Sequence, residues 1–182
     1  MAHMHTKLVT IYRTFMPESG PAGIAVGMPG DMSYNWDAGA CRFRYAWTGG
    51  FVDLTKNWKG NGRDKAVIVG TIFYREETPA PIRIGTKGHI PKHKFKGYIL
   101  INSYPTFKYM LDDVEVSERI TPATEVEGFQ RTLTFTNLKK TLWFVKADAD
   151  KKPLNSTGKW NGNYLAVTPK AGKARLVLTF EK

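Results

Sequence analysis

The stretch CRFRYAWTGGFVDLTKNWKGNGRDKAVIVGTIFYR, residues 41–75, decides the fold class. At its start, polar or small residues alternate with Cys41, Phe43, Tyr45 and Trp47. Because successive side chains of a strand point to opposite faces, this period of two predicts a half-buried β-strand. One face of that strand is expected to be apolar, and the other partly basic.

The rest of this stretch predicts a loop and a second strand. Gly49 and Gly50 allow a sharp change of backbone direction after the first strand. Residues 66–75 are apolar at both alternating sets of positions, which predicts a strand buried between two layers. The connection between them, TKNWKGNGRD at 55–64, carries one tryptophan among polar residues and glycines. We expect that connection to lie at the surface.

Similar alternation recurs outside this stretch. Further strands are expected at 7–15, 24–27, 32–36, 98–101, 107–111, 114–120, 129–136, 141–147, 164–168 and 174–181, with a short extended piece at 51–54. Gly, Pro, Asn and Asp punctuate them, and no window has the period of a long helix. An antiparallel sandwich or an open barrel fits this pattern. We predict an all-β antiparallel β-sandwich, jelly-roll or super-sandwich-like, with few or no helices.

Length and composition fit one domain. The 182 residues suffice for a single core, and no apolar run is long enough to predict a membrane span. Residues 1–5, MAHMH, are typical of a remnant left by expression, so His3 and His5 are set aside and a single β-sandwich domain is expected over 6–182. The one cysteine, Cys41, excludes an internal disulfide and is expected in the core.

The net charge of +11 raises the question of an anionic partner. The basic residues are spread along the chain, with a local concentration at 87–96. No nucleic-acid-reading motif accompanies them, so a nucleic-acid partner is not expected. Most of these charges are expected on solvated loops, and an acidic polymer stays open as a partner.

No cofactor or metal is expected. His89 and His93 are four residues apart, but Gly88 and Pro91 break any helix there, and no carboxylate is expected nearby. The glycines at 60–63 fit neither a P-loop nor a dinucleotide fingerprint. No catalytic triad or pair of carboxylates stands out, so catalysis ranks below binding.

Carbohydrate binding is the chemistry that this sequence suits best. Tryptophan rings offer flat apolar surface to the C–H face of a sugar, and polar side chains beside them can bond its hydroxyls. The candidate residues are the two rings Trp58 and Trp47 and the polar groups Asp53, Asn57, Arg63 and Arg44. Two alternatives stay open. Trp47 shares its predicted face with core aromatics, and Trp58 can pack inward as a loop anchor.

Four segments carry a resemblance to a known family: RTFMP (13–17), SYNWDAG (33–39), RYAWTGGFVD (44–53) and PTFKY (105–109). Residues 11–135 resemble a non-catalytic β-rich module of large exported bacterial proteins that also carry c-type cytochrome and sugar-dehydrogenase-like domains. The chain has no CxxCH, so it cannot itself attach a haem covalently.

The resemblance implies an accessory role in carbohydrate metabolism and a periplasmic or extracellular location. Two functions are therefore predicted. The first is a carbohydrate-binding or accessory module, with a polysaccharide or oligosaccharide held near Trp58, Asp53 and Arg63. The alternative is a structural domain that docks against cytochrome or dehydrogenase neighbours through an exposed aromatic patch.

Overall fold

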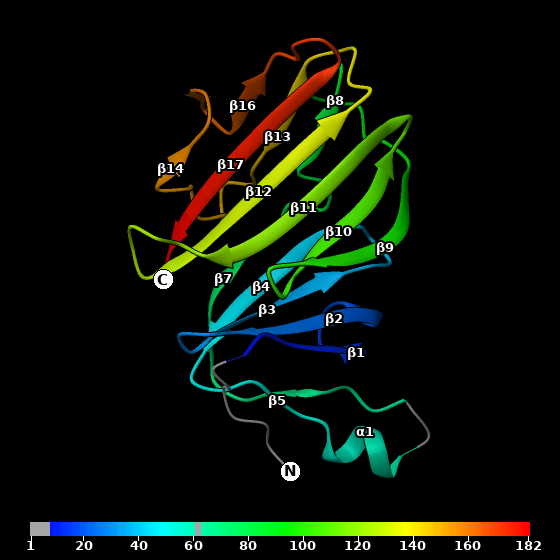
Figure 1. The fold of residues 1–182 in the computed structure, drawn as a ribbon, viewed down its shortest axis with the longest axis vertical. Coiled ribbons are helices and arrows are strands. Elements are labelled where there is room, and N and C mark those ends of the chain that lie inside the picture. The colour runs from blue at the N-terminus through cyan, green and yellow to red at the C-terminus, as the bar shows by residue number, and fades with distance from the viewer. Residues whose placement is uncertain (1–7, 61–62) are drawn as a thin grey trace. The chain divides into compact units, whose positions relative to one another are not determined.

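The computed structural model describes residues 8–60 and 63–182 and is all-β with one short helix (Figure 1). Its antiparallel sheets form a sandwich-like arrangement, which confirms the predicted fold class. Residues 1–5, read as an expression remnant, lie outside the described residues. The chain divides into two compact units, one ending at Arg75 and the other beginning at Glu76. That residues 6–182 form a single domain stays a prediction. It is tested by thermal unfolding, in which one cooperative transition is expected for one domain.

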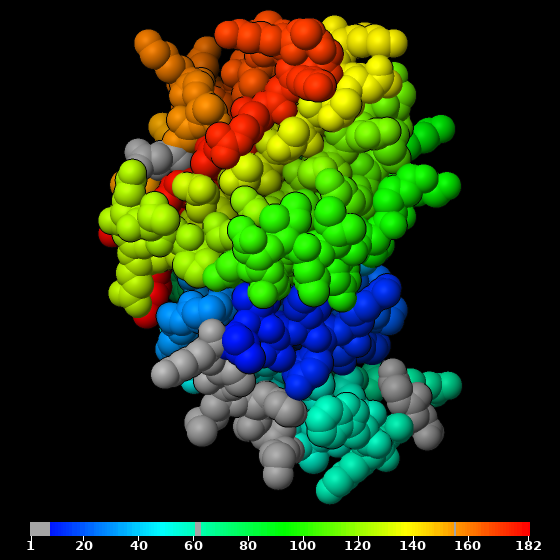
Figure 2. Space-filling model, in the orientation of Figure 1, coloured from blue at the N-terminus to red at the C-terminus, as the bar shows by residue number. Residues whose placement is uncertain are grey.

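The first unit is built on a five-stranded sheet of order β1-β2-β3-β4-β7. These strands are β1 (Thr10–Met16), β2 (Gly20–Met28), β3 (Met32–Asp37), β4 (Arg42–Thr48) and β7 (Thr71–Arg75). Between β4 and β7 the chain forms β5 (Val52–Asp53), helix α1 (Thr55–Lys59) and β6 (Val67–Ile68). None of the α1 residues is buried, and the helix lies at the surface (Figure 2).

The second unit contains a six-stranded sheet of order β14-β17-β12-β11-β10-β9 and a four-stranded sheet of order β15-β16-β13-β8. The first sheet consists of β9 (His93–Ile101), β10 (Tyr104–Leu111), β11 (Val114–Pro122), β12 (Gly128–Thr136), β14 (Asn155–Ser156) and β17 (Lys173–Glu181). The second consists of β8 (Ile82–Ile84), β13 (Leu142–Val145), β15 (Trp160–Asn161) and β16 (Tyr164–Val167). No helix among the described residues is long and apolar enough to span a membrane.

A β-bulge in β4 changes the faces that its aromatic side chains occupy. Asn35 pairs with Tyr45 and Trp36 pairs with Phe43, so Arg44 is an extra residue in β4. Because Asn35 and Trp36 are neighbours in one strand, their cross-strand partners lie on opposite faces. The prediction that Phe43 shares a face with Tyr45 was therefore wrong.

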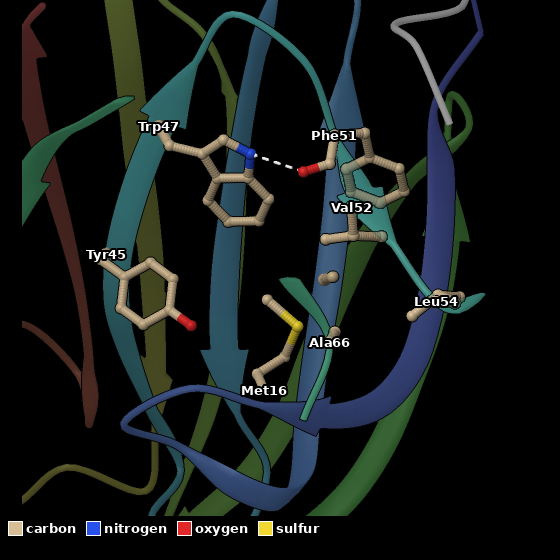
Figure 3. Close-up of a cluster of buried hydrophobic side chains, with 8 residues drawn as sticks. Met16, Tyr45, Trp47, Phe51, Val52, Leu54 and Ala66 are labelled. Carbon is tan, nitrogen blue, oxygen red and sulfur yellow. Dashed lines mark hydrogen bonds between the residues drawn. The ribbon is translucent and has the colours of Figure 1, made fainter. Parts of the chain in front are cut away.

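The segment after β4 covers one face of the five-stranded sheet (Figure 3). Trp47 is fully buried there, its ring stacks on that of Phe51 at 6.2 Å between centroids, and its indole N–H donates to the Phe51 carbonyl at 3.0 Å. Val52, Leu54 and Ala66 complete this cover. Residues 51–66 are thus packed onto the sheet at both ends, although α1 between them is exposed.

Gly70 divides the segment that was predicted as one buried strand. Its φ of +126° lies in the region that favours glycine, and a Cβ there would lie 2.0 Å from the Thr48 carbonyl oxygen. The chain consequently forms two short strands, and the side chain of Val67 in the first is 49% exposed. The prediction of a continuous strand over 66–75, buried between two layers, was wrong because the glycine permits a bend in the backbone.

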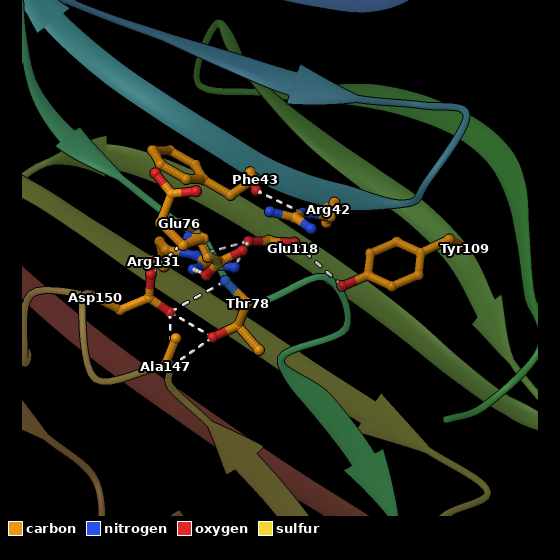
Figure 4. A network of polar contacts seen from close by, with 10 residues as sticks. Arg42, Phe43, Glu76, Thr78, Tyr109, Glu118, Arg131, Ala147 and Asp150 are labelled. Carbon is orange, nitrogen blue, oxygen red and sulfur yellow. Dashed lines mark hydrogen bonds and ion pairs between the residues drawn. The ribbon is translucent and has the colours of Figure 1, made fainter. Parts of the chain in front are cut away.

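A charged cluster is buried between the two sheets of the second unit (Figure 4). The Arg131 guanidinium contacts the carboxylate of Glu76 at 2.5 Å and that of Glu118 at 2.8 Å, and all three side chains are at most 2% exposed. Tyr109 donates its hydroxyl hydrogen to Glu118 at 3.1 Å. The guanidinium lies 5.7 Å from the ring centroid of Phe144 in the facing sheet, so the inner faces of the two sheets meet around this cluster.

The carboxylate of Asp150 organises the backbone around the beginning of the second unit. It accepts hydrogen bonds from the backbone N–H of Glu77 at 2.5 Å, of Thr78 at 3.2 Å and of Ala147 at 2.9 Å, as well as from the Thr78 hydroxyl (Figure 4). The group is buried. One side chain therefore joins two segments that are distant in sequence.

Candidate functional site

Helix α1 presents Trp58 to solvent. The indole side chain is 64% exposed, the largest exposed aromatic among the described residues. The single turn of helix is closed by hydrogen bonds from the Trp58 N–H to Leu54 and from the Gly60 N–H to Lys56, at 3.1 and 3.0 Å. The sequence left open whether this ring is exposed or packs inward, and the structure decides for exposure. The helix was not predicted, because five residues are too few to show a helical period.

Asp53 and Asn57, predicted to bond sugar hydroxyls, make hydrogen bonds that brace the helix. One oxygen of Asp53 accepts the backbone N–H and the hydroxyl of Thr55, at 2.9 and 2.5 Å, and these hydrogen bonds lower the pKa of the Asp53 carboxyl. The Asn57 amide donates to the Thr14 hydroxyl at 3.2 Å and to the Asp64 carbonyl at 2.7 Å. These contacts hold α1 against β1 and the residues that follow it.

The three other predicted site residues occupy different surroundings. Arg44, the bulge residue, is half-buried and donates to the Glu18 carbonyl in the turn after β1. Trp47 is enclosed in the core, so it is a core residue, the alternative that its position among aromatics left open, and it offers no surface to a sugar. Arg63 is exposed. Of the six predicted residues, Trp58 and Arg63 are exposed, Asp53, Asn57 and Arg44 are half-buried, and Trp47 is buried.

A second aromatic surface, on the four-stranded sheet, was missed by sequence analysis. In β13, Leu142 and Phe144 are buried, so Trp143 between them lies on the opposite face of the sheet. Tyr164 of β16 pairs with Val145 and therefore lies on that same face. Both rings are half-buried. Alternation predicted both strands, but it could not predict that they are neighbours.

Lys87 lies between these two rings. Its Nζ is 4.9 Å from the ring centroid of Trp143 and 4.4 Å from that of Tyr164, within the range of cation–π attraction. The Trp143 indole N–H donates to the Gly85 carbonyl at 3.2 Å, which fixes the ring against the loop that carries Lys87.

An open depression adjoins this surface at the end of the sheet. It is lined by Gly85, Thr86, Lys139, Lys140, Thr141 and Thr168, with Pro169. Two lysines and three threonines thus line it, and none of its lining residues is acidic. A neighbouring cavity shares the two lysines but contains the pair His89 and Asp112.

The His89 ring nitrogen lies 2.6 Å from an Asp112 carboxylate oxygen, and the other oxygen accepts the Lys92 N–H at 2.9 Å. The hydrogen bond to His89 lowers the pKa of the Asp112 carboxyl. The inference that His89 has no carboxylate near it was wrong, because Asp112 is distant in sequence. Within 8–60 and 63–182, no group of three or more His, Cys, Asp or Glu side chains that could hold a metal ion is present.

Compared with known protein families, curated proteins and solved structures, the chain has no match. The resemblance of residues 11–135 to an exported β-rich module stays a prediction.

Proposed function

We propose that the protein is a non-catalytic carbohydrate-binding or accessory module of a larger exported protein, with Trp58 as the residue on which a sugar ring stacks. The exposed indole of Trp58 carries this proposal. An aromatic ring of this size at the surface offers binding area with few rotatable bonds to immobilise. The bracing of α1 by Asn57 keeps the platform in place before a ligand arrives.

The charges around this platform favour ligands rich in oxygen acceptors. Lys56 and Lys59 lie in the last turn of α1, and Arg63 is exposed a few residues later. These side chains supply hydrogen-bond donors to hydroxyl and carboxylate oxygens. Asp53 and Asn57 contribute by holding the helix rather than by contacting the sugar.

The test is calorimetric titration of the full chain with neutral and acidic oligosaccharides. Trp58→Ala is expected to weaken glycan binding about tenfold, because an aromatic contact contributes about 0.5–1.5 kcal/mol beyond its buried area. Leu154→Ala is the matched control, since Leu154 is also a large exposed apolar residue, 52% exposed, in the other unit. Equal glycan affinity of the wild type and Trp58→Ala contradicts the proposal, as does an absence of binding to every glycan tested.

A docking role is the second candidate function, and β9 favours it. This strand is at the edge of the six-stranded sheet, and its last three residues, Ile99, Leu100 and Ile101, are all exposed. An exposed apolar edge strand is a template for pairing with another chain. The partner proposed is a cytochrome or dehydrogenase neighbour. Ile99→Lys with Ile101→Lys is expected to abolish binding to such a recombinant neighbour, whereas Trp58→Ala is expected to leave it unchanged.

A further inference from the structure

We propose a second ligand site on the four-stranded sheet of the second unit, for uronate residues of an acidic polysaccharide. Trp143 and Tyr164 provide the surface for the sugar ring, and Lys87 provides the charge that binds its carboxylate. This site shares no residue with the Trp58 platform, so the two proposals stand or fall separately.

The two rings form a preorganised surface. Trp143 and Tyr164 come from paired strands and lie on one face of the sheet, and each is half-buried, so their positions are fixed by packing. The hydrogen bond from the Trp143 indole to the Gly85 carbonyl fixes the ring further. Arg83 pairs with Trp143 across β8 and β13 and so lies on the same face. An aromatic surface flanked by a guanidinium is suited to a sugar that bears an anionic group.

Lys87 is the group most readily recruited by a carboxylate. Its ammonium contacts the two rings, and no acidic partner for it is present in the described part of the chain. A cation–π contact at an exposed site is weaker than a charge-assisted hydrogen bond to a carboxylate. A uronate can therefore draw the ammonium from the rings, which uncovers their faces for the pyranose ring. The exchange replaces the two cation–π contacts by an ion pair with the carboxylate and by stacking of the pyranose on the rings.

Several other positive groups point to an anionic ligand rather than a cationic one. Lys139 and Lys140 line the adjoining depression, which no acidic side chain lines. Arg83 donates to the Ala80 carbonyl at 2.6 Å and to the Lys87 carbonyl at 3.5 Å, which holds its positive charge beside the loop. An organic cation would meet this repulsion and would also have to displace a tethered ammonium, whose effective concentration is high.

The same chemistry distinguishes a uronate from a nucleic acid. Single-stranded nucleic acids bind where positive charges follow a groove beside stacked aromatic rings. Here the lysines of the depression gather at one end of the sheet, where Thr86, Thr141 and Thr168 also line it. A single carboxylate and the hydroxyls of its sugar match that arrangement better than a row of phosphates.

The test is calorimetric titration of the full chain with a galacturonate oligomer and with a neutral galactose oligomer of equal length. The wild type is expected to bind the acidic oligomer at least tenfold more tightly. Lys87→Met, which keeps an unbranched side chain over the rings, is expected to lose that difference. Lys65→Met is the matched control, because Lys65 lies over a single ring, that of Phe15, at 5.7 Å.

Equal losses from Lys87→Met and Lys65→Met would overturn the proposal, since they would indicate attraction by net charge alone. Tighter binding of choline than of the galacturonate oligomer, strengthened by Lys87→Met, would overturn it, as would tighter binding of oligouridylate that Lys87→Met abolishes. Trp58→Ala is expected to leave binding of the acidic oligomer at this site unchanged, and Lys87→Met is expected to leave Trp58-dependent binding unchanged. Circular dichroism of each variant shows that the fold is retained.

Discussion

Replacing Arg131 with Met is expected to destabilise the second unit by about 3–5 kcal/mol, because the change leaves buried carboxylates without their counter-charge. Arg131 is 1% exposed and contacts two carboxylates, those of Glu76 and Glu118, which have almost no access to water. The Tyr109 hydroxyl still donates to Glu118 in the variant, but no positive charge replaces the guanidinium. For a chain of this size, the loss corresponds to a fall in melting temperature of roughly 6–20 °C.

A second variant separates the electrostatic contribution to this loss of stability from the contribution of packing. Arg131→Met combined with Glu76→Gln and Glu118→Gln removes all three charges while keeping similar volumes, and is expected to be more stable than the single variant. Urea denaturation followed by circular dichroism measures both. A loss below about 1 kcal/mol for Arg131→Met, or a triple variant no more stable than the single one, would refute the reasoning.

Three further changes test other parts of the fold. Gly70→Ala is expected to destabilise the first unit by at least ~2 kcal/mol in thermal denaturation, because its methyl group would clash with the Thr48 carbonyl oxygen. Gly88→Ala is the control and is expected to be neutral, since open space surrounds that position. Asp150→Asn is expected to lower the free energy of unfolding by about 1–3 kcal/mol in urea, because an amide N–H₂ then faces backbone donors; an unchanged midpoint would contradict this role. The hydrogen bond between His89 and Asp112 is expected to stabilise the fold fully above the ordinary Asp pKa of 3.8, and this contribution should vanish as pH falls through the lowered pKa of Asp112 in the folded state. The difference in free energy of unfolding between the wild type and Asp112→Asn should therefore close on acidification. A difference that does not change with pH would contradict this role.

Alternation in the sequence predicted most strands because apolar and polar residues report directly which side chains are buried. It failed where the backbone departs from a regular strand. The bulge at Arg44 changes the phase of β4, and the bend at Gly70 splits the predicted strand, yet neither interrupts the run of strand-forming residues. The lysines of HKFKG, residues 93–97, favour a solvated loop, so alternation predicts only 98–101 as a strand, whereas β9 begins at His93.

The sequence singled out Trp58 because a tryptophan among glycines and polar residues has few apolar neighbours, but it left open whether the ring packs inward. It could not reach the grouping of Lys87, Trp143 and Tyr164, which depends on strand order in the four-stranded sheet. The roles of Asp53 and Asn57 also depend on partners: Asn57 bonds Thr14, far away in the chain. Local patterns reveal exposure, whereas the partners of a polar group follow from the tertiary fold.

Because of the additional residue in β4, this strand contributes aromatic side chains to both faces of the sheet, and each face has its own aromatic group. Phe43 stacks with Tyr34 on one side, and Trp47 stacks with Phe51 on the other. Deleting Arg44 would remove the extra residue and place Tyr45 directly after Phe43, so the two rings would stay on opposite faces, and Asn35 would still pair with Tyr45 and Trp36 with Phe43. A one-residue deletion at this position is thus expected to leave both aromatic groups filled and to remove the hydrogen bond from Arg44 to the Glu18 carbonyl.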